Sequence, residues 1–334
     1  MASYKNFIQE NTAPMGVKRI GIYNEQGNRT GYVLLGNLMK EKGQKLYSFG
    51  ALSDVHVQYE TGVSDFQKAL GYLNNTEDVE FTCICGDLTS NGTDSELTTY
   101  KDLVNGYSPN TPVYAVFGNH DTYQGLHNTT EAYTGFPLCY TVTRGNDVFI
   151  MVGISSGEEG TIFANGQLQW LYEQLEANRN KRCFLFEHVP PVECSGDVLG
   201  IYPYTKLRNS TEALVFKSLL KHYHNVVFFH GHTHMKFYLQ EYGDIANYDK
   251  IFGCHTVHIP SLAVPRDTNN SGGYTNVYAA SEGYVVDVYD KGIHLRGRDF
   301  VKEEFIPIAS YWIDTTLIEI EAKTYKDSTG TITT

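Results

Sequence analysis

Apolar runs of strand length alternate with segments of helical period between residues 45 and 229. The runs are residues 45–52, 79–85, 112–117, 147–154, 182–186 and 225–229. In several of the segments between them, apolar residues recur every three or four positions, as in Val63, Phe66, Leu70 and Leu73. That period places them on one face of an amphipathic helix. Buried strands that alternate with such helices predict an α/β domain with a largely parallel central sheet.

The two ends of the chain differ from this region. After about residue 250 the helical period disappears, and apolar segments broken by Gly and Pro indicate strands that add to or complete a second sheet. Residues 1–43 are rich in Gly, Asn and Lys and contain one short strand-like pair around a turn. We therefore predict an N-terminal extension over residues 1–43, one main domain over residues 44–310 and a C-terminal tail over residues 311–334.

Charge and hydropathy exclude several classes of protein. The 38 acidic residues outnumber the 26 basic ones, which gives a net charge of -12. Such a surface repels phosphate backbones at long range, so we expect no non-specific binding to nucleic acid. No stretch approaches the roughly 20 apolar residues of a membrane helix, and the first 45 residues lack a secretory signal pattern. We expect a cytoplasmic protein without a membrane segment and with buried free cysteines. A homo-oligomer is possible, and the sequence does not decide the oligomeric state.

Polar side chains follow five of the six apolar runs at the point where each run ends. These residues are Asp54 and His56; Asp87; Asn119, His120 and Asp121; His188; and His232 and His234. Ligands bind where loops leave the carboxyl ends of strands in open α/β sheets. One polar residue after a strand is usually a turn former. Five such segments at one edge indicate a functional site.

The spacing of these residues suits metal ions. Asp-x-His and His-x-His place two side chains on the same side of an extended backbone, where both can face one cation or two adjacent cations. Oxygen and nitrogen ligands without thiolate favour Mn, Fe, Zn or Co over soft metals and over calcium. His230 is the last residue of its apolar run, and we interpret it as structural rather than as a ligand.

The five segments, in this order, resemble the calcineurin-like metallophosphoesterase family, and the resemblance covers roughly residues 45–235. It implies a four-layer α/β/β/α sandwich of two mixed sheets flanked by helices, with two divalent metals at the strand ends. It further implies the ligands of each metal: Asp54, His56 and His234 for one, Asn119, His188 and His232 for the other, and Asp87 as the bridge. The stretch from Gly86 to Asp121 is similar to the cyclic nucleotide phosphodiesterase branch of the family.

The resemblance predicts a binuclear metal-dependent phosphoesterase with a small phosphate-ester substrate. In-line attack by a metal-bridging hydroxide would hydrolyse a phosphodiester bond, with phosphomonoesters left open. We expect His120 to contact the phosphate and to protonate the leaving alkoxide, while Asp121 orients or charges the imidazole. The alternative for Asp121 is a cap for the helix that follows.

Two other readings compete with this one. Residues 153–157, Gly-Ile-Ser-Ser-Gly, match the nucleophile elbow of serine hydrolases and would make Ser155 the nucleophile. The elbow requires a helix directly behind the serine, but Glu158 and Glu159 follow here and would oppose an oxyanion, so we expect a loop that borders the metal site. The second alternative is a catalytically weak metal-binding or interaction module. The full ligand set and His120 favour an enzyme, and the 25 tyrosines suggest an interaction surface whose place the sequence does not give.

Overall fold

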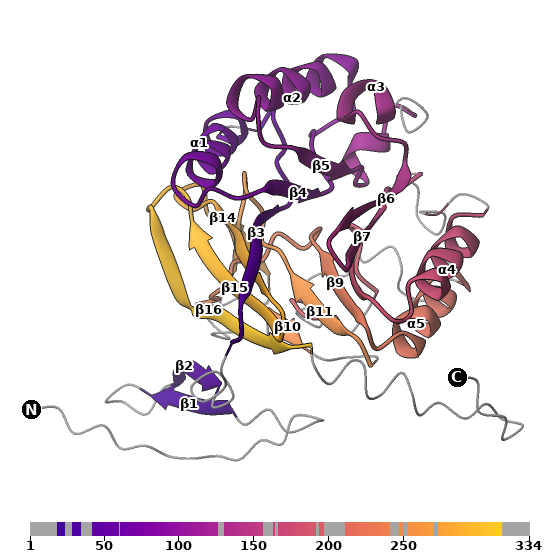
Figure 1. Ribbon diagram of the computed structural model, residues 1–334. Coiled ribbons are helices and arrows are strands. Elements are labelled where there is room, and N and C mark those ends of the chain that lie inside the picture. Colours follow the sequence, from indigo (N-terminus) through magenta and orange to yellow (C-terminus); the bar gives the residue numbers. More distant parts are fainter. Residues whose placement is uncertain are drawn as a thin grey trace, which may run out of the picture.

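The computed structural model describes residues 19–23, 29–34, 42–59, 61–125, 130–155, 163, 166–191, 194–196, 211–240, 247–249, 253–269 and 273–315. Two six-stranded mixed sheets pack face to face, and helices cover the outer face of each sheet (Figure 1). This four-layer α/β/β/α sandwich confirms the fold that the family resemblance implies.

The first sheet has the order β16-β15-β14-β3-β4-β5. Its strands are β3 (Lys45–Leu52), β4 (Phe81–Cys85), β5 (Val113–Val116), β14 (Glu282–Tyr289), β15 (Gly292–Asp299) and β16 (Glu304–Asp314). Strands β3, β4 and β5 are parallel, while β14, β15 and β16 continue the sheet in antiparallel fashion from β3.

The second sheet has the order β10-β11-β9-β8-β7-β6. Its strands are β6 (Cys139–Arg144), β7 (Asp147–Val152), β8 (Arg182–Phe186), β9 (Val226–His230), β10 (Tyr248–Asp249) and β11 (His255–His258). The four central strands are parallel, and β6 and β10 are antiparallel edges. The strand and helix alternation predicts a largely parallel central sheet, but the parallel strands are divided between two mixed sheets, because that alternation does not say which sheet a buried strand joins.

Helices form the two outer layers. α1 (Gly62–Asn75) and α2 (Asp94–Tyr107) pack on the first sheet, and α4 (Gln167–Ala177) and α5 (Thr211–His222) pack on the second. A short α3 (Thr130–Thr134) lies between β5 and β6. α2 begins with a capping box, in which the Thr93 side chain accepts from the Glu96 N–H and the Glu96 carboxylate accepts from the Thr93 N–H.

Phenylalanine rings from both sheets form the core between them. Phe184 and Phe186 on β8 point into this core, while Cys183 and Leu185, the alternate residues, face α4 and α5. The rings of Phe186 and Phe229 stack with centroids 4.8 Å apart, one from each of two neighbouring strands. β8 and β9 are buried on both faces, which explains why the sequence shows continuous apolar runs there rather than polar alternation.

The remaining described elements lie outside the two large sheets. β1 (Arg19–Tyr23) and β2 (Arg29–Leu34) pair in antiparallel fashion, which matches the strand pair expected in the N-terminal segment. β12 (Arg266–Thr268) and β13 (Tyr274–Asn276) form a small hairpin. β16 crosses the boundary placed after residue 310, and residues 316–334 of the predicted tail fall outside the described part of the chain.

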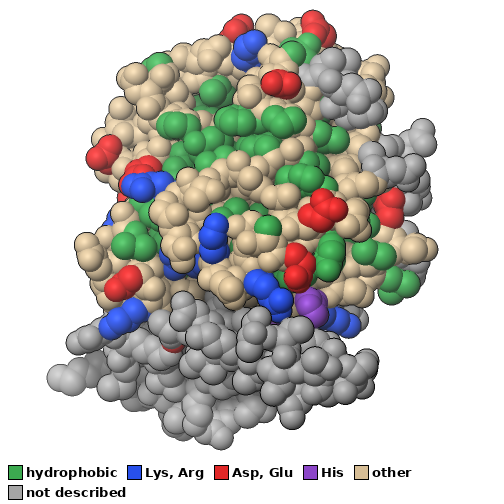
Figure 2. All heavy atoms as spheres, turned by 45° about the vertical axis from the view of Figure 1, so that its right-hand side comes forward, with side chains coloured by type: hydrophobic (Ala, Val, Ile, Leu, Met, Phe, Trp, Pro, Cys, Tyr) green, Lys and Arg blue, Asp and Glu red, His purple; other side chains and the backbone are tan. Residues whose placement is uncertain are grey.

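Two surface properties of the described residues bear on the sequence expectations. None of their helices combines the length and the apolar character needed to cross a bilayer. Basic and acidic side chains are interspersed on the face drawn in Figure 2, and hydrophobic side chains gather across its upper half. The net negative charge is therefore not concentrated in one patch of that face.

Candidate metal centre

The five polar segments meet at one end of the sandwich. Three of them follow β3, β4 and β5 of the first sheet, and two follow β8 and β9 of the second. Backbone hydrogen bonds join neighbouring segments, from Asp54 N–H to the Gly86 carbonyl at 3.0 Å and from Gly231 N–H to the His188 carbonyl at 3.1 Å. A Cβ on Gly231 would lie 1.9 Å from Ser53 Oγ, so only glycine allows the two sheets' loops to approach this closely.

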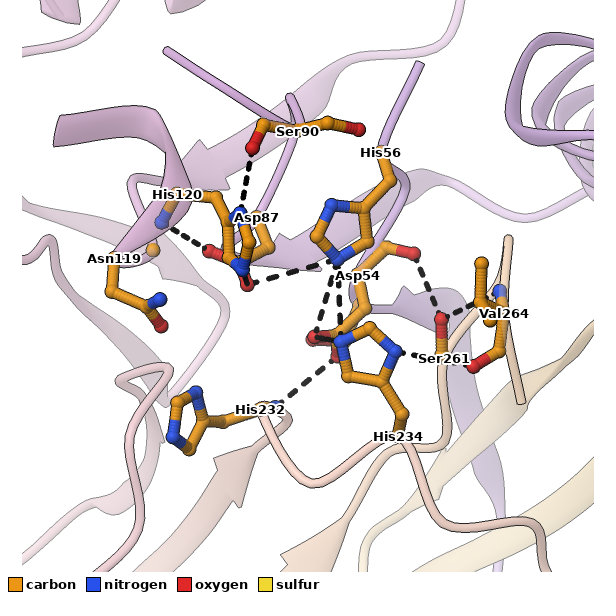
Figure 3. Close-up of polar contacts among 12 residues, drawn as sticks. Asp54, His56, Asp87, Ser90, Asn119, His120, His232, His234, Ser261 and Val264 are labelled. Atoms are coloured by element: carbon orange, nitrogen blue, oxygen red, sulfur yellow. Dashed lines mark hydrogen bonds and ion pairs between the residues drawn. The ribbon is translucent and has the colours of Figure 1, made fainter. Parts of the chain in front are cut away.

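Seven side chains bring their donor atoms together in this place, and Figure 3 labels six of them, all except His188. Asp54, His56, Asp87 and His234 form one group that could hold a metal ion, and Asp87, His188 and His232 form a second, with donor atoms within 4.8 Å of one another in each group. Asp87 belongs to both groups. The seventh residue is Asn119, whose side chain is 3% exposed.

The distances between donor atoms are short. His188 Nε2 lies 3.1 Å from Asp87 Oδ2, and His234 Nε2 lies 3.0 Å from Asp54 Oδ1. Yet Asp54 Oδ1, Asp87 Oδ2 and His188 Nε2 are buried without a hydrogen bond among the described residues, and so is Asn119 Oδ1. Leaving a buried polar atom unsatisfied costs about 1–3 kcal/mol. Donor atoms that converge without hydrogen-bond geometry fit the coordination of shared cations.

Backbone carbonyls orient the imidazoles. His188 Nδ1 lies 2.6 Å from the Cys85 carbonyl, and His234 Nδ1 lies 3.1 Å from the Val264 carbonyl. With Nδ1 engaged in each ring, Nε2 faces the centre, which is the usual support for a ligating histidine. Sequence reasoning missed these partners, because a carbonyl group carries no residue-type signal.

Charge is balanced within the cluster itself. Burial alone would raise the pKa of Asp87, but His188 and His120 outweigh it and hold that pKa well below its usual range. Burial would lower the pKa of His188, whereas Asp87 and Asp54 raise it to about 10. Burial lowers the pKa of His56 to about 3, so this ring is neutral. The carboxylates of Asp54 and Asp87 are therefore ionised. The His188 imidazolium balances part of their negative charge, and bound cations would take over this role.

The backbone at these positions is strained. Non-glycine residues with positive φ occur at seven described positions, and five of them are in the two groups: Asp54 (54°), His56 (42°), Asp87 (50°), His232 (71°) and His234 (61°). The left-handed region costs of order 1–3 kcal/mol for a residue with a side chain, and such residues cluster at functional sites. The strain falls where the chain must turn a donor atom toward the centre.

His120 and Asp121 lie in the short 3-10 helix His120–Thr122 and differ from each other in environment. The His120 side chain is 33% exposed, its Nε2 lies 3.9 Å from Asp87 Oδ2 and its Nδ1 lies 2.7 Å from the Ser90 carbonyl. The Asp121 carboxylate is fully buried and accepts from the N–H groups of Gly118, Leu88 and Thr89. The expectation that Asp121 orients the imidazole is corrected, because the Ser90 carbonyl holds the ring.

Three further residues near the centre were either not assigned to the metal site or not predicted from the sequence: His230, Ser155 and Tyr123. His230 ends β9, is fully buried and has its Nε2 3.3 Å from Ser195 Oγ; it belongs to neither donor group. Ser155 is buried beyond the end of β7, and the next described helix, α4, begins at Gln167. Tyr123 was not predicted from the sequence, although its hydroxyl accepts from Asn119 Nδ2 at 3.1 Å, while Asn119 Oδ1 is buried without a hydrogen bond among the described residues.

Two known proteins are similar to this chain. The probable glycerophosphodiester phosphodiesterase GpdQ of Arcobacter nitrofigilis is 28% identical over 156 residues, which cover 42% of this chain and 56% of that protein. The chain thus spans little more than half the length of this curated relative. The solved structure described as GAP50, the anchor in the inner membrane complex of Plasmodium, has a TM-score of 0.53 at 15% identity, covering 87% of this chain and all of that one. At that identity the likeness shows the fold alone.

The sequence match to a protein family covers the whole candidate centre. Residues 47–236 match the calcineurin-like phosphoesterase family, and this span contains all five strand-end segments and both donor groups. The two mixed sheets and the buried donor atoms at their strand ends agree with that match. The chain belongs to the calcineurin-like phosphoesterase family.

Proposed function

We propose that this protein is a binuclear metal-dependent phosphoesterase that hydrolyses phosphodiester bonds. One observation carries the proposal: two buried donor groups share the carboxylate of Asp87, and Asp54 Oδ1, Asp87 Oδ2 and His188 Nε2 lie in them without a hydrogen bond among the described residues. Asp54, His56 and His234 would bind one cation, Asn119, His188 and His232 the other, and Asp87 would bridge them. The donor set of oxygens and nitrogens suits Mn, Fe, Zn or Co.

The chain's own residues would complete the reaction around these cations. Two divalent ions would activate a water for in-line attack at phosphorus and would neutralise the charge that develops there. His120, at the exposed edge of the cluster, would donate a proton from Nε2 to the leaving oxygen, since Nδ1 is engaged by Ser90. Asp121 would act as a positioning residue, because its carboxylate joins the segments that carry Asp87 and Asn119.

Small phosphodiesters are the favoured substrates. The curated relative is named a glycerophosphodiester phosphodiesterase, which supports a diester over a monoester. The stretch from Gly86 to Asp121, similar to the cyclic nucleotide phosphodiesterase branch, points in the same direction. The cytoplasmic location and the division into residues 1–43, 44–310 and 311–334 remain predictions.

Hydrolysis of two aryl esters tests the proposal. The purified protein, loaded separately with Mn, Fe, Zn or Co, should hydrolyse bis(p-nitrophenyl) phosphate with a higher kcat/KM than p-nitrophenyl phosphate. The variants His232→Ala and His234→Ala should each lose about one metal equivalent by elemental analysis and most of the activity. His230→Ala is the matched control in the same segment and should keep both metals. A preference for the monoester would contradict the diester assignment and leave the metal centre standing.

A binding module on the same fold is the second candidate. The solved structure described as an anchor in the inner membrane complex has the same fold, so the fold by itself does not require catalysis. An absence of turnover with all four metals, in a protein that binds two equivalents, would support this candidate. The serine hydrolase reading is tested by Ser155→Ala, which should leave diester hydrolysis essentially intact.

A further inference from the structure

A run of five aromatic rings crosses the metal centre. It passes from Tyr278 to Tyr59, His56, His120 and Tyr123. The centroids of Tyr59 and Tyr278 are 6.2 Å apart with an interplanar angle of 21°, and those of His56 and Tyr59 are 6.1 Å apart. His56 and His120 follow at 4.9 Å, and His120 and Tyr123 at 4.7 Å. The run therefore connects the donor cluster to tyrosines on both sides of it.

The three tyrosines of this run are open to solvent. Tyr59 is 39% exposed, Tyr278 is 38% exposed and Tyr123 is 48% exposed. Single exposed aromatic residues are common and require no explanation. These three, however, come from three separate segments, after β3, after β13 and after β5, and each makes a ring contact within the same run. That three exposed tyrosines from separate segments all join the run of rings through the donor cluster needs an explanation.

The β12–β13 hairpin fixes the position of Tyr278. Arg266, at the start of the hairpin, donates its N–H to the His234 carbonyl at 2.7 Å, which ties the hairpin to the donor cluster. The Val277 N–H donates to the Pro265 carbonyl at 2.7 Å and closes the hairpin on itself. The Tyr278 hydroxyl accepts from Asn276 Nδ2 at 3.1 Å. The ring is thus held beside Tyr59 by the same element that supports His234.

We propose that Tyr59 and Tyr278 form a stacking subsite for a planar aromatic arm of the phosphodiester, such as a nucleobase or an aryl group. The inference rests on the proposed function and narrows its substrate class. Two nearly parallel exposed rings offer a π-face to a planar group, and each stacked base adds a substantial share of binding energy. A glycerol arm has no such face. Tyr123, next to His120, would flank the other arm of the diester.

A matched pair of phosphates isolates the planar arm. Adenosine 5′-monophosphate and ribose 5-phosphate carry the same phosphate and sugar charge and differ in the base. Titration calorimetry on the metal-loaded protein should show about tenfold tighter binding of the adenosine compound, within the range measured for base stacking on aromatic side chains. Tyr278→Leu and Tyr59→Leu should each reduce this ratio several-fold and leave ribose 5-phosphate binding unchanged.

Controls separate the subsite from folding and from the metal centre. Tyr107→Leu removes a tyrosine of similar exposure, 44%, at the end of α2, and should keep the full ratio. Metal content is measured in every variant because Tyr59 adjoins His56; if Tyr59→Leu loses metal, the Tyr278→Leu result decides. The stacking subsite would be refuted if the wild type bound adenosine 5′-monophosphate and ribose 5-phosphate equally well. It would also be refuted if Tyr278→Leu kept the tenfold difference of the wild type. Hydrolysis of bis(p-nitrophenyl) phosphate is scored separately, so a protein with the tenfold ratio but no turnover would refute the proposed function and not the subsite.

Discussion

At the scale of single residues, accessibility divides the histidines of the centre into two kinds. His56, His188, His232 and His234 are at most 5% exposed, whereas the side chain of His120 is 33% exposed. A buried neutral imidazole suits coordination, because it cannot exchange protons with substrate without opening the site. An imidazole at the edge, with one nitrogen fixed by a carbonyl, suits proton transfer to a bound ester. In the sequence all five histidines follow strand-length apolar runs, so the motif does not show this difference.

Replacement of His120 should therefore depend on the leaving group. His120→Gln should keep both metals but lower kcat/KM about 10²- to 10⁴-fold for a diester with an alkoxide leaving group, such as a glycerophosphodiester. The loss should be much smaller for bis(p-nitrophenyl) phosphate, since a nitrophenolate departs without a proton. Steady-state kinetics on both substrates, with metal analysis of the variant, measures the effect. Equal losses on the two substrates would argue against His120 as the acid.

At the scale of elements, the centre depends on how the segments after neighbouring strands are tied together. The Asp121 carboxylate accepts four hydrogen bonds, from the N–H groups of Gly118 and Leu88 and from the N–H and hydroxyl of Thr89. It thereby links the segment after β4 to the segment after β5. Such a link is invisible in a motif, where Asp121 simply follows His120.

Asp121→Asn should loosen this link. An amide in either orientation sets an NH2 group against backbone donors, so the variant should lose roughly 3 kcal/mol of unfolding free energy. Thr89→Val removes a hydroxyl that donates to Asp121 and accepts from the Gly92 N–H, and it should lose about 2 kcal/mol. Urea denaturation of the three proteins gives both values. An Asp121→Asn variant as stable as the wild type would show that the carboxylate does not hold the two segments.

The first residue of β14 provides a pH-dependent element away from the donor cluster. Glu282 is buried and accepts from the Phe237 N–H at 2.7 Å. Burial raises its pKa from 4.5 to about 7. The folded protein thus binds this proton more tightly than the unfolded chain, and the associated stability, about 3 kcal/mol, is present at low pH and lost as pH rises through about 7.

Glu282→Gln should remove that pH dependence while keeping an acceptor for the Phe237 N–H. The unfolding free energy of the variant minus that of the wild type should increase by about 3 kcal/mol between pH 5 and pH 8. Denaturant titrations at four pH values in that interval measure the difference. A constant difference would mean that Glu282 ionises in the folded protein as it does in the unfolded chain.

At the scale of the whole molecule, the family resemblance predicts the four-layer fold, while periodicity alone predicts strands without their order in the two sheets. The run at residues 182–186 coincides with β8, and all nine predicted site residues lie at one end of the two sheets. Periodicity alone did not divide the strands between the two sheets, because a buried strand shows the same apolar run in either sheet. It also missed β6, whose residues are mostly part-exposed or exposed. The carbonyl groups of Cys85 and Val264, which contact the rings of His188 and His234, could not be predicted from the sequence, because any residue can supply a carbonyl.

Because the two donor groups draw on segments of both sheets, cations there should stabilise the entire sandwich. Chelation would leave two buried carboxylates with His188 as their main compensation, whose pKa Asp87 and Asp54 already raise. Ligands that bind only the folded state add about 4 kcal/mol at a concentration 1,000-fold above Kd. Calorimetric melting of the protein after exhaustive chelation should therefore show a lower Tm, which Mn restores. Asp87→Ala, which lacks the shared ligand, should recover little on the same addition. An unchanged Tm after proven metal removal would mean that the cations bind without joining the two sheets.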